Sequence, residues 1–307
     1  MSEATPLNSF KAAAKILTWL DAMGCLKLPI DLDLVRQMLP DTPFGRGAVI
    51  KKPADLTWGT SEGALVQNPD NQAEWGIFVN PKARAERRRF TVAHELGHFV
   101  LHRLTQPKFN CDKESVYSGI ATLKTIEREA DDFASNLLMP GNMLRNRIDG
   151  KRIDIHLLGD LAKEFGVSLE AICIRLIKFT EQRAVLVYWD NGFLKYQWPS
   201  SDARKTRVRL HQTGDPQEPL AGTLAADAEV DQEWSGVDMP ASAWCSSEAP
   251  EIQLRELKHT YADGNRVLSL LMLESAPPRN YQRSGWDDEE TPDTFDRFID
   301  NGQLPVR

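Results

Sequence analysis

The chain has 307 residues, of which 41% are hydrophobic and 26% are charged, an ordinary balance for a globular protein. This length suggests two domains, since single hydrophobic cores stop growing near about 250–300 residues. No apolar run approaches the roughly 18 residues of a membrane span, and the N-terminus lacks the apolar centre of a signal peptide. We therefore expect a cytoplasmic protein with no membrane partner. The four cysteines form no CxxC pair, which argues against a disulfide framework and a cysteine-rich zinc finger.

The net charge of −7 is concentrated at the C-terminus. Residues 286–307 carry seven acidic side chains and two arginines, so this acidic tail accounts for −5. The rest of the chain is nearly neutral, and bulk charge therefore neither favours nor excludes nucleic-acid binding.

The first 180 or so residues are predicted to be mostly helical. A helix over residues 9–23 begins at Ser9 as a candidate cap. Short apolar runs in residues 47–80, divided by Gly, Pro and Asn, predict a small sheet, and residues 105–121 read as irregular. Further helices are predicted over residues 31–39, 83–104, 123–138, 142–148, 153–165 and 168–180.

From Arg183 the pattern changes to alternating strands. Two aromatic-rich runs joined by Asn191 and Gly192 predict a β-hairpin, because Asn-Gly is the strongest short turn signal. Three more strands are predicted over residues 205–212, 251–261 and 266–273. We expect an α+β protein with a mainly helical domain over residues 1–181, a β-rich domain over residues 182–285 and the acidic tail.

Residues 94–98 read His-Glu-Leu-Gly-His. Residues four apart on a helix differ by about 40°, so His94 and His98 project side by side and can share a metal ion. Glu95 lies about 100° away, beside the metal, where it suits a general base acting on water. The alternative is a coincidental helix with two histidines satisfied by other contacts.

A hydrolytic zinc needs a third protein ligand and one open position. Glu127 and Asp131 lie one turn apart on the helix predicted after the motif, so Glu127 can bind the metal while Asp131 orients a histidine through its other ring nitrogen. Small side chains at Ala130 and Ala134 allow the two helices to approach closely. Glu129 is the fallback ligand, and a solvated acidic face is the alternative reading.

The run RRRFTVAHELGHFVLH, followed by EREADDFASNLLMP, resembles the ImmA/IrrE family of zinc metallopeptidases. The resemblance covers about residues 10–180, including GIFVN upstream and LAKEFGVSLEAICIRL downstream. It implies His94, His98 and Glu127 as ligands of Zn²⁺ and Glu95 as the catalytic residue. A site of two histidines and one carboxylate could also hold Mn²⁺.

The resemblance also implies a biological role. Members of this family typically cleave a partner helix-turn-helix repressor, which relieves repression of stress, DNA-damage or phage-defence genes. Some of them carry a C-terminal GAF-like sensor domain, and the β-rich half resembles that layout in strand pattern. A single-stranded DNA or a small-molecule activator is the ligand expected for this domain.

Four other positions are candidates for roles in the reaction. Thiolate is a good zinc ligand, so Cys111 could cap the zinc of a resting enzyme, against the alternative of an ordinary loop cysteine. Tyr117, His102 and His156 are candidates for stabilising an oxyanion. His102 is also read as a residue that supports the ligands or lies in the core.

A DNA-binding regulator or sensor with a structural metal site is the alternative function. The two helices predicted over residues 153–181 have helix-turn-helix spacing, but they offer bases few polar side chains, which favours a packing role. Two basic runs, at residues 82–89 and 204–209, could bind an acidic partner or a single strand, or could form intramolecular salt bridges and a mixed surface.

Overall fold

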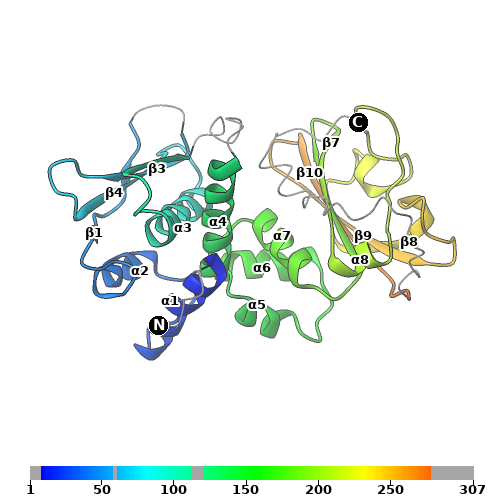
Figure 1. Ribbon diagram of the computed structural model, residues 1–307. Coiled ribbons are helices and arrows are strands. Elements are labelled where there is room, and N and C mark those ends of the chain that lie inside the picture. The colour runs from blue at the N-terminus through cyan, green and yellow to red at the C-terminus, as the bar shows by residue number, and fades with distance from the viewer. Residues whose placement is uncertain (1–7, 58–60, 112–120, 278–307) are drawn as a thin grey trace, which may run out of the picture. The chain divides into compact units, whose positions relative to one another are not determined.

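The computed structural model describes residues 8–57, 61–111 and 121–277. Its contacts divide the chain into two compact units, residues 1–147 with 162–168, and residues 148–161 with 169–307. Each unit contains helices and a five-stranded sheet, so the fold is α+β as predicted (Figure 1). The acidic tail lies outside the described residues.

The helices of the first unit follow the predicted order. They are α1 (Ser9–Ala22), α2 (Leu32–Met38), α3 (Ala85–Leu101), α4 (Ala121–Leu138) and α5 (Gly141–Ile148). The expected cap at Ser9 is wrong by one residue, because the side chain of Asn8 accepts the Lys11 N–H at 2.9 Å and Ser9 is already helical. Asp31 caps α2 in the same way by accepting the N–H groups of Asp33 and Leu34.

The sheet of the first unit has the order β1-β4-β3-β5, with β2 also pairing with β4. Its strands are β1 (Val49–Ile50), β2 (Ala54–Asp55), β3 (Gly63–Gln67), β4 (Glu74–Val79) and β5 (Lys108–Cys111). The predicted small sheet is confirmed, but β5 lies in a stretch that was expected to be irregular. α3 packs against β3 and β4 as well as α4, and α1 packs against α4 (Figure 1).

The sheet of the second unit is antiparallel throughout and has the order β7-β6-β10-β9-β8. The elements that follow α5 are α6 (Ile155–Phe165), which crosses the division between the units, α7 (Leu169–Phe179), β6 (Ala184–Asp190), β7 (Phe193–Pro199), α8 (Ser201–Lys205), β8 (Gln232–Pro240), β9 (Gln253–Thr260) and β10 (Arg266–Leu273). The predicted hairpin is confirmed, with Asn191 and Gly192 at φ 53° and 81° in its turn.

One predicted strand of the second unit is wrong. Residues 205–212 begin at the end of α8, whose first turn is capped by Ser200 accepting the Ala203 N–H. Arg207 then adopts a left-handed conformation at φ 56°, and Leu210 makes an isolated bridge to Cys245. The fifth strand is instead β8, an edge strand in which most residues are exposed or half-buried, so its hydrophobic pattern is weak.

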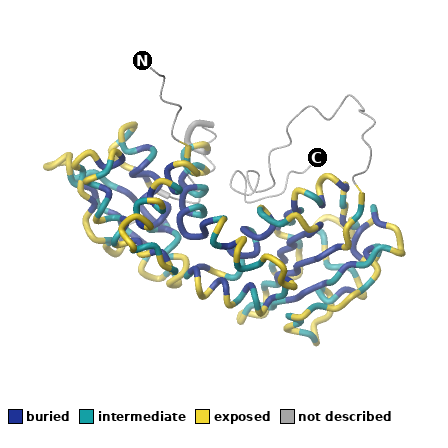
Figure 2. Tube along the Cα trace, turned by 90° about the horizontal axis from the view of Figure 1, so that it is seen from below, coloured by how far each residue is buried: buried dark blue, intermediate teal, exposed yellow. Residues whose placement is uncertain are grey.

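The sheet of the second unit is covered on both faces. On one face, Val185, Val187 and Leu271 pack with Trp189 and Trp244 in a buried cluster. The other face contacts α7, whose residues Ile172, Cys173, Arg175, Leu176 and Ile177 are buried. Figure 2 shows buried residues along the interior of each unit and exposed residues at its periphery.

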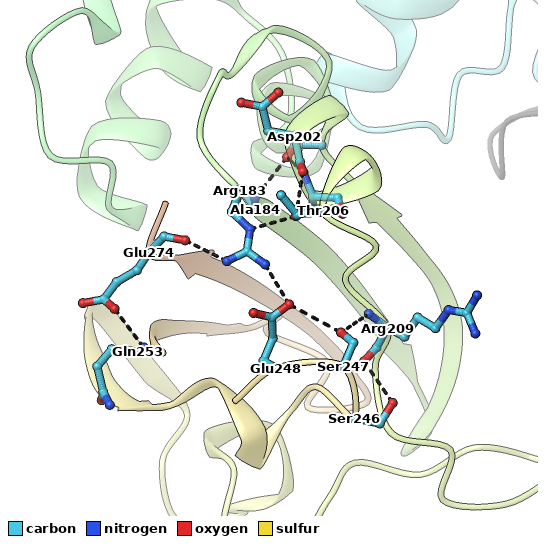
Figure 3. Close-up of polar contacts among 12 residues, drawn as sticks. Arg183, Ala184, Asp202, Thr206, Arg209, Ser246, Ser247, Glu248, Gln253 and Glu274 are labelled. Atoms are coloured by element: carbon cyan, nitrogen blue, oxygen red, sulfur yellow. Dashed lines mark hydrogen bonds and ion pairs between the residues drawn. The ribbon is translucent and has the colours of Figure 1, made fainter. Parts of the chain in front are cut away.

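A buried ion pair lies beside the sheet of the second unit, where Arg183, just before β6, contacts residues that follow α8 and β10. The Arg183 guanidinium donates to Glu248 Oε1 at 2.7 Å, to Thr206 Oγ1 at 2.8 Å and to the Glu274 carbonyl at 2.9 Å (Figure 3). Both charged side chains are buried, so each charge depends on the other and on these hydrogen bonds.

Within the described ranges, no helix combines the length and the apolar character needed to cross a membrane.

Candidate metal centre

The close approach of α3 and α4 forms the centre. A Cβ built on Gly97 would lie 3.0 Å from Phe133 Cδ1 and 3.2 Å from the Cα of Ala130. The absence of a side chain at Gly97, together with a methyl group at Ala130, therefore lets the two helix backbones approach closely. The approach brings the motif of α3 beside the acidic face of α4.

Three side chains from these helices converge on one point. His94 Nε2 lies 2.9 Å from His98 Nε2 and 3.2 Å from Glu127 Oε2, and His98 Nε2 lies 3.4 Å from Glu127 Oε1. The two histidines are buried and the Glu127 side chain is 15% exposed. These three residues also form a group whose donor atoms all lie within 4.8 Å of one another.

The donor set fits a divalent metal. Ligands held at about 2.0–2.1 Å in tetrahedral geometry lie roughly 3.3 Å apart, close to the three separations observed. Two imidazole nitrogens that face each other at 2.9 Å need a cation or a shared proton between their lone pairs. Two nitrogens and one carboxylate are a donor set that suits Zn²⁺.

Asp131 holds His94 in the orientation that this set requires. Its Oδ1 lies 2.8 Å from His94 Nδ1, so the Nδ1–H donates to the carboxylate and leaves the Nε2 lone pair for a metal. Asp131 is one turn after Glu127 on α4. The contacts are compatible with the expected roles, in which Glu127 binds the metal and Asp131 orients a histidine.

His98 is supported differently. Its Nδ1 lies 3.2 Å from His102 Nδ1, and His102 Nε2 lies 2.9 Å from Glu129 Oε2. Glu129 therefore contacts His102 and is not part of the three-residue group, which removes it as the fallback ligand. His102 thus contacts His98 directly, which is compatible with one of its predicted roles.

Burial and polar contacts set the charge states of His98 and Glu127. Burial lowers the pKa of His98 to about 4, although Glu127 opposes this change. For Glu127, burial raises the pKa, but the polar contacts with the two histidines, His94 and His98, outweigh it and hold the pKa well below the ordinary value. Near pH 7 the site therefore offers a neutral His98 and an ionised Glu127, the forms that bind metal.

Glu95 is fully buried between α3 and the sheet. A Cβ on Gly63, at the start of β3, would lie 2.7 Å from Glu95 Oε1 and 2.3 Å from Thr91 Cγ2. The glycine therefore leaves the space that the Glu95 carboxyl group occupies. The sequence pattern gave no indication of this role for Gly63.

β5 passes beside the histidines. The Phe109 ring stacks on His98 with centroids 4.6 Å apart, and Cys111 ends the strand, paired in register with Gly63. The side chain of Cys111 and the whole of Tyr117 lie outside the described residues. His156 packs edge-on against Trp234 within the second unit.

The first basic run is largely engaged within the protein. Arg88 pairs with Asp55 at 3.0 Å, and Arg87 lies 3.8 Å from Glu62. Arg89 donates to the carbonyl of Ile30. These contacts agree with the alternative of intramolecular salt bridges.

Comparisons with known proteins find similarity in the part of the chain that holds this site. Residues 54–177 match the family described as the IrrE N-terminal-like domain. The chain is 33% identical over 113 residues to the "Radiation response metalloprotease IrrE" of Deinococcus radiodurans, a match that covers 37% of this chain and 33% of that protein. The protein of the same name from Deinococcus deserti is 30% identical over 104 residues, covering 34% of this chain and 36% of its own length. The matches thus span about a third of each relative.

Among solved structures, a "Mycobacterium tuberculosis transcriptional regulator" overlaps 85% of this chain and 87% of its own. Its TM-score of 0.43 and its 12% sequence identity are too low to support a conclusion. The family profile and the two curated relatives support the resemblance found in the motif strings: residues 54–177 are similar to the ImmA/IrrE family.

Proposed function

We propose that this protein is a zinc-dependent endopeptidase in which His94, His98 and Glu127 hold the metal and Glu95 is the catalytic base. The convergence of three donor atoms from α3 and α4 is the observation that carries this proposal. The contact between Asp131 and His94 supports it, because a carboxylate behind a histidine is the usual companion of a metal ligand. Mn²⁺ is the second candidate for the same donor set.

The reaction we propose is hydrolysis of a peptide bond. A bound Zn²⁺ would supply Lewis-acid polarisation of a carbonyl oxygen and would make nearby water more acidic. Glu95 accepts a proton from the attacking water and passes it to the leaving amine. Burial against Gly63 fixes the position of Glu95. Tyr117 remains a candidate donor to the oxyanion.

The substrate we propose is a partner helix-turn-helix repressor. Its cleavage would derepress stress, DNA-damage or phage-defence genes. The name of the two relatives, a metalloprotease of the radiation response, supports proteolysis in a stress pathway.

The domain assignment is part of the same proposal. Residues 1–181 act as the peptidase domain, and residues 182–285 act as a GAF-like sensor for single-stranded DNA or a small-molecule activator. The continuous antiparallel sheet of β6 to β10 is compatible with a separate β-rich domain.

We also propose that Cys111 restrains the resting enzyme by binding the zinc. Its position in the chain supports this, because it is paired with Gly63 and follows two residues after Phe109, which stacks on His98. Cys111→Ser should raise basal proteolysis, whereas unchanged or lower activity would refute the restraint.

Co-expression with a candidate partner helix-turn-helix repressor tests the function. Intact-mass analysis should find a cut repressor with the wild type and an uncut one with Glu95→Gln, while both proteins bind metal. Cleavage by Glu95→Gln would refute the role of Glu95. An intact repressor in both cases, with and without a DNA-damaging agent, would refute this substrate.

The DNA-binding alternative predicts salt-sensitive binding of duplex DNA that survives loss of metal. The burial of Arg175 on α7 disfavours it, because a buried basic side chain cannot contact DNA. A duplex-binding titration with and without chelator separates the two functions.

A further inference from the structure

The polar contacts of the metal centre continue beyond the three donor residues, on the side of His98. His98 Nδ1 and His102 Nδ1 are 3.2 Å apart, and His102 Nε2 is 2.9 Å from Glu129 Oε2. Both histidines are buried. From this chain of contacts, and resting on the metal site proposed above, we propose that His102 and Glu129 are positioning residues that hold His98 in its metal-binding tautomer.

The direction of each hydrogen bond follows from Glu129. An ionised carboxylate only accepts, so His102 Nε2 must carry a hydrogen and donate it. A neutral His102 then has an unprotonated Nδ1, which accepts from the Nδ1–H of His98. His98 is thereby left with a lone pair on Nε2, the atom that lies 2.9 Å from His94 Nε2.

The two histidine ligands thus reach the same tautomer by different routes. His94 contacts the carboxylate of Asp131 directly, whereas an imidazole separates His98 from the carboxylate of Glu129. The Glu129 side chain is 45% exposed, so its charge remains near solvent while a neutral ring contacts the fully buried His98. This arrangement avoids the cost of burying a further carboxylate.

Packing confines His98 and His102 to this arrangement. The Phe109 ring is stacked on His98 at a centroid distance of 4.6 Å and lies 6.3 Å from the His102 ring. Because Phe109 is only 2% exposed, it closes one side of the histidine pair against solvent. Loss of the His102 acceptor would leave a buried Nδ1–H without that partner, and His98 would then gain by moving the hydrogen to Nε2.

The test is the Zn²⁺ affinity of the full chain, measured by competition with a chromophoric chelator. The variants are His102→Leu, which removes the acceptor, and His102→Asn, which keeps an oxygen near the Nδ1 position but ends the contact with Glu129. Glu129→Leu ends the same contact from the other side, whereas Glu129→Gln keeps an acceptor. Glu86→Leu is the matched control, since Glu86 is an exposed residue in the first turn of α3.

We expect His102→Leu to bind Zn²⁺ about 10–100-fold more weakly, the usual effect of losing a residue behind a ligand. His102→Asn and Glu129→Leu should show smaller losses, and Glu129→Gln and Glu86→Leu should match the wild type. Nitrogen NMR of the metal-free protein should find His98 protonated on Nδ1 in the wild type and partly on Nε2 in His102→Leu.

Two outcomes would overturn the proposal and can be told apart. A wild type that binds no Zn²⁺ would refute both the metal site and the positioning role of His102 and Glu129. Tight binding by the wild type, with equal affinity in folded His102→Leu or His102→Asn, would refute only the positioning role of His102 and Glu129. Circular dichroism of each metal-free variant establishes that it is folded.

Discussion

Gly97 of α3 and Ala130 of α4 lie so close that a Cβ on Gly97 would stand 3.2 Å from both the Cα and the carbonyl oxygen of Ala130. This contact lies between His94 and His98 in the sequence on one helix and just after Glu127 on the other. The spacing of the two helices therefore determines whether the carboxylate can reach the imidazoles.

A larger residue at Gly97 should separate the helices and weaken the metal site. We expect Gly97→Val to lower the free energy of unfolding by about 1–3 kcal/mol through overpacking and to weaken Zn²⁺ binding more than tenfold. Urea unfolding and chelator competition measure the two effects. The control is Gly159→Ala in α6, where nothing lies within 4 Å of the added Cβ, so it should stabilise by roughly 0.5–1 kcal/mol. Unchanged metal affinity in Gly97→Val would contradict this view of the site.

A side chain at Gly63 should displace Glu95 without removing the ligands. The methyl group of Gly63→Ala would lie 2.7 Å from Glu95 Oε1, so the carboxyl group must move. We expect peptidase activity to fall at least tenfold while Zn²⁺ binding remains within about twofold, since general-base catalysis is worth about 10²–10⁴-fold. Thr91→Ser, which removes the Cγ2 in the other close contact, should partly restore activity in the double variant. Full activity in Gly63→Ala would refute the role of this glycine.

The metal-free protein should lose stability as the pH falls from about 6.5 to about 4. Folded His98 has a pKa lowered to about 4, so in this window the unfolded chain binds a proton that the folded chain does not. Protonation therefore favours unfolding there, and stability is complete only above the ordinary histidine pKa. Thermal unfolding in chelator at several pH values measures the slope, and His98→Gln should show a shallower one. Identical slopes in the two proteins would contradict the burial of a neutral His98.

Removing one partner of the buried ion pair between Arg183 and Glu248 should destabilise the second unit. Glu248→Leu leaves the Arg183 guanidinium buried without its carboxylate, and we expect a loss of about 3–5 kcal/mol in the free energy of unfolding. The double variant Arg183→Met with Glu248→Leu should recover much of this loss. Urea unfolding of the three proteins provides the comparison, and a double variant less stable than Glu248→Leu would contradict this explanation.

Spacing within each helix predicted which side chains of the candidate metal centre share a face. His94 and His98 project together because they are four residues apart, and the same rule relates Glu127 to Asp131. Contacts that depend on how helices cross could not be predicted in this way. Glu129 points to His102 because of the geometry between α3 and α4, although its sequence position suggested only a fallback ligand.

Among the strands, too, features set by local sequence were predicted and features set by long-range pairing were not. The turn at Asn191 and Gly192 predicted its hairpin because the conformational requirement is local. β5 was missed because its pairing with β3 connects residues far apart in the sequence. The alternating pattern of residues 205–212 was misleading, because the cap at Ser200 begins a helix just before it.

The metal content of the purified protein tests the central claim most directly. Elemental analysis should find about one zinc or manganese ion per chain in the wild type and in Glu95→Gln, since Glu95 is proposed to act beside the metal. His94→Ala and Glu127→Ala should retain little metal while remaining folded. Equal metal content in all four proteins, or none in the wild type, would contradict the assignment of His94, His98 and Glu127 as the ligands.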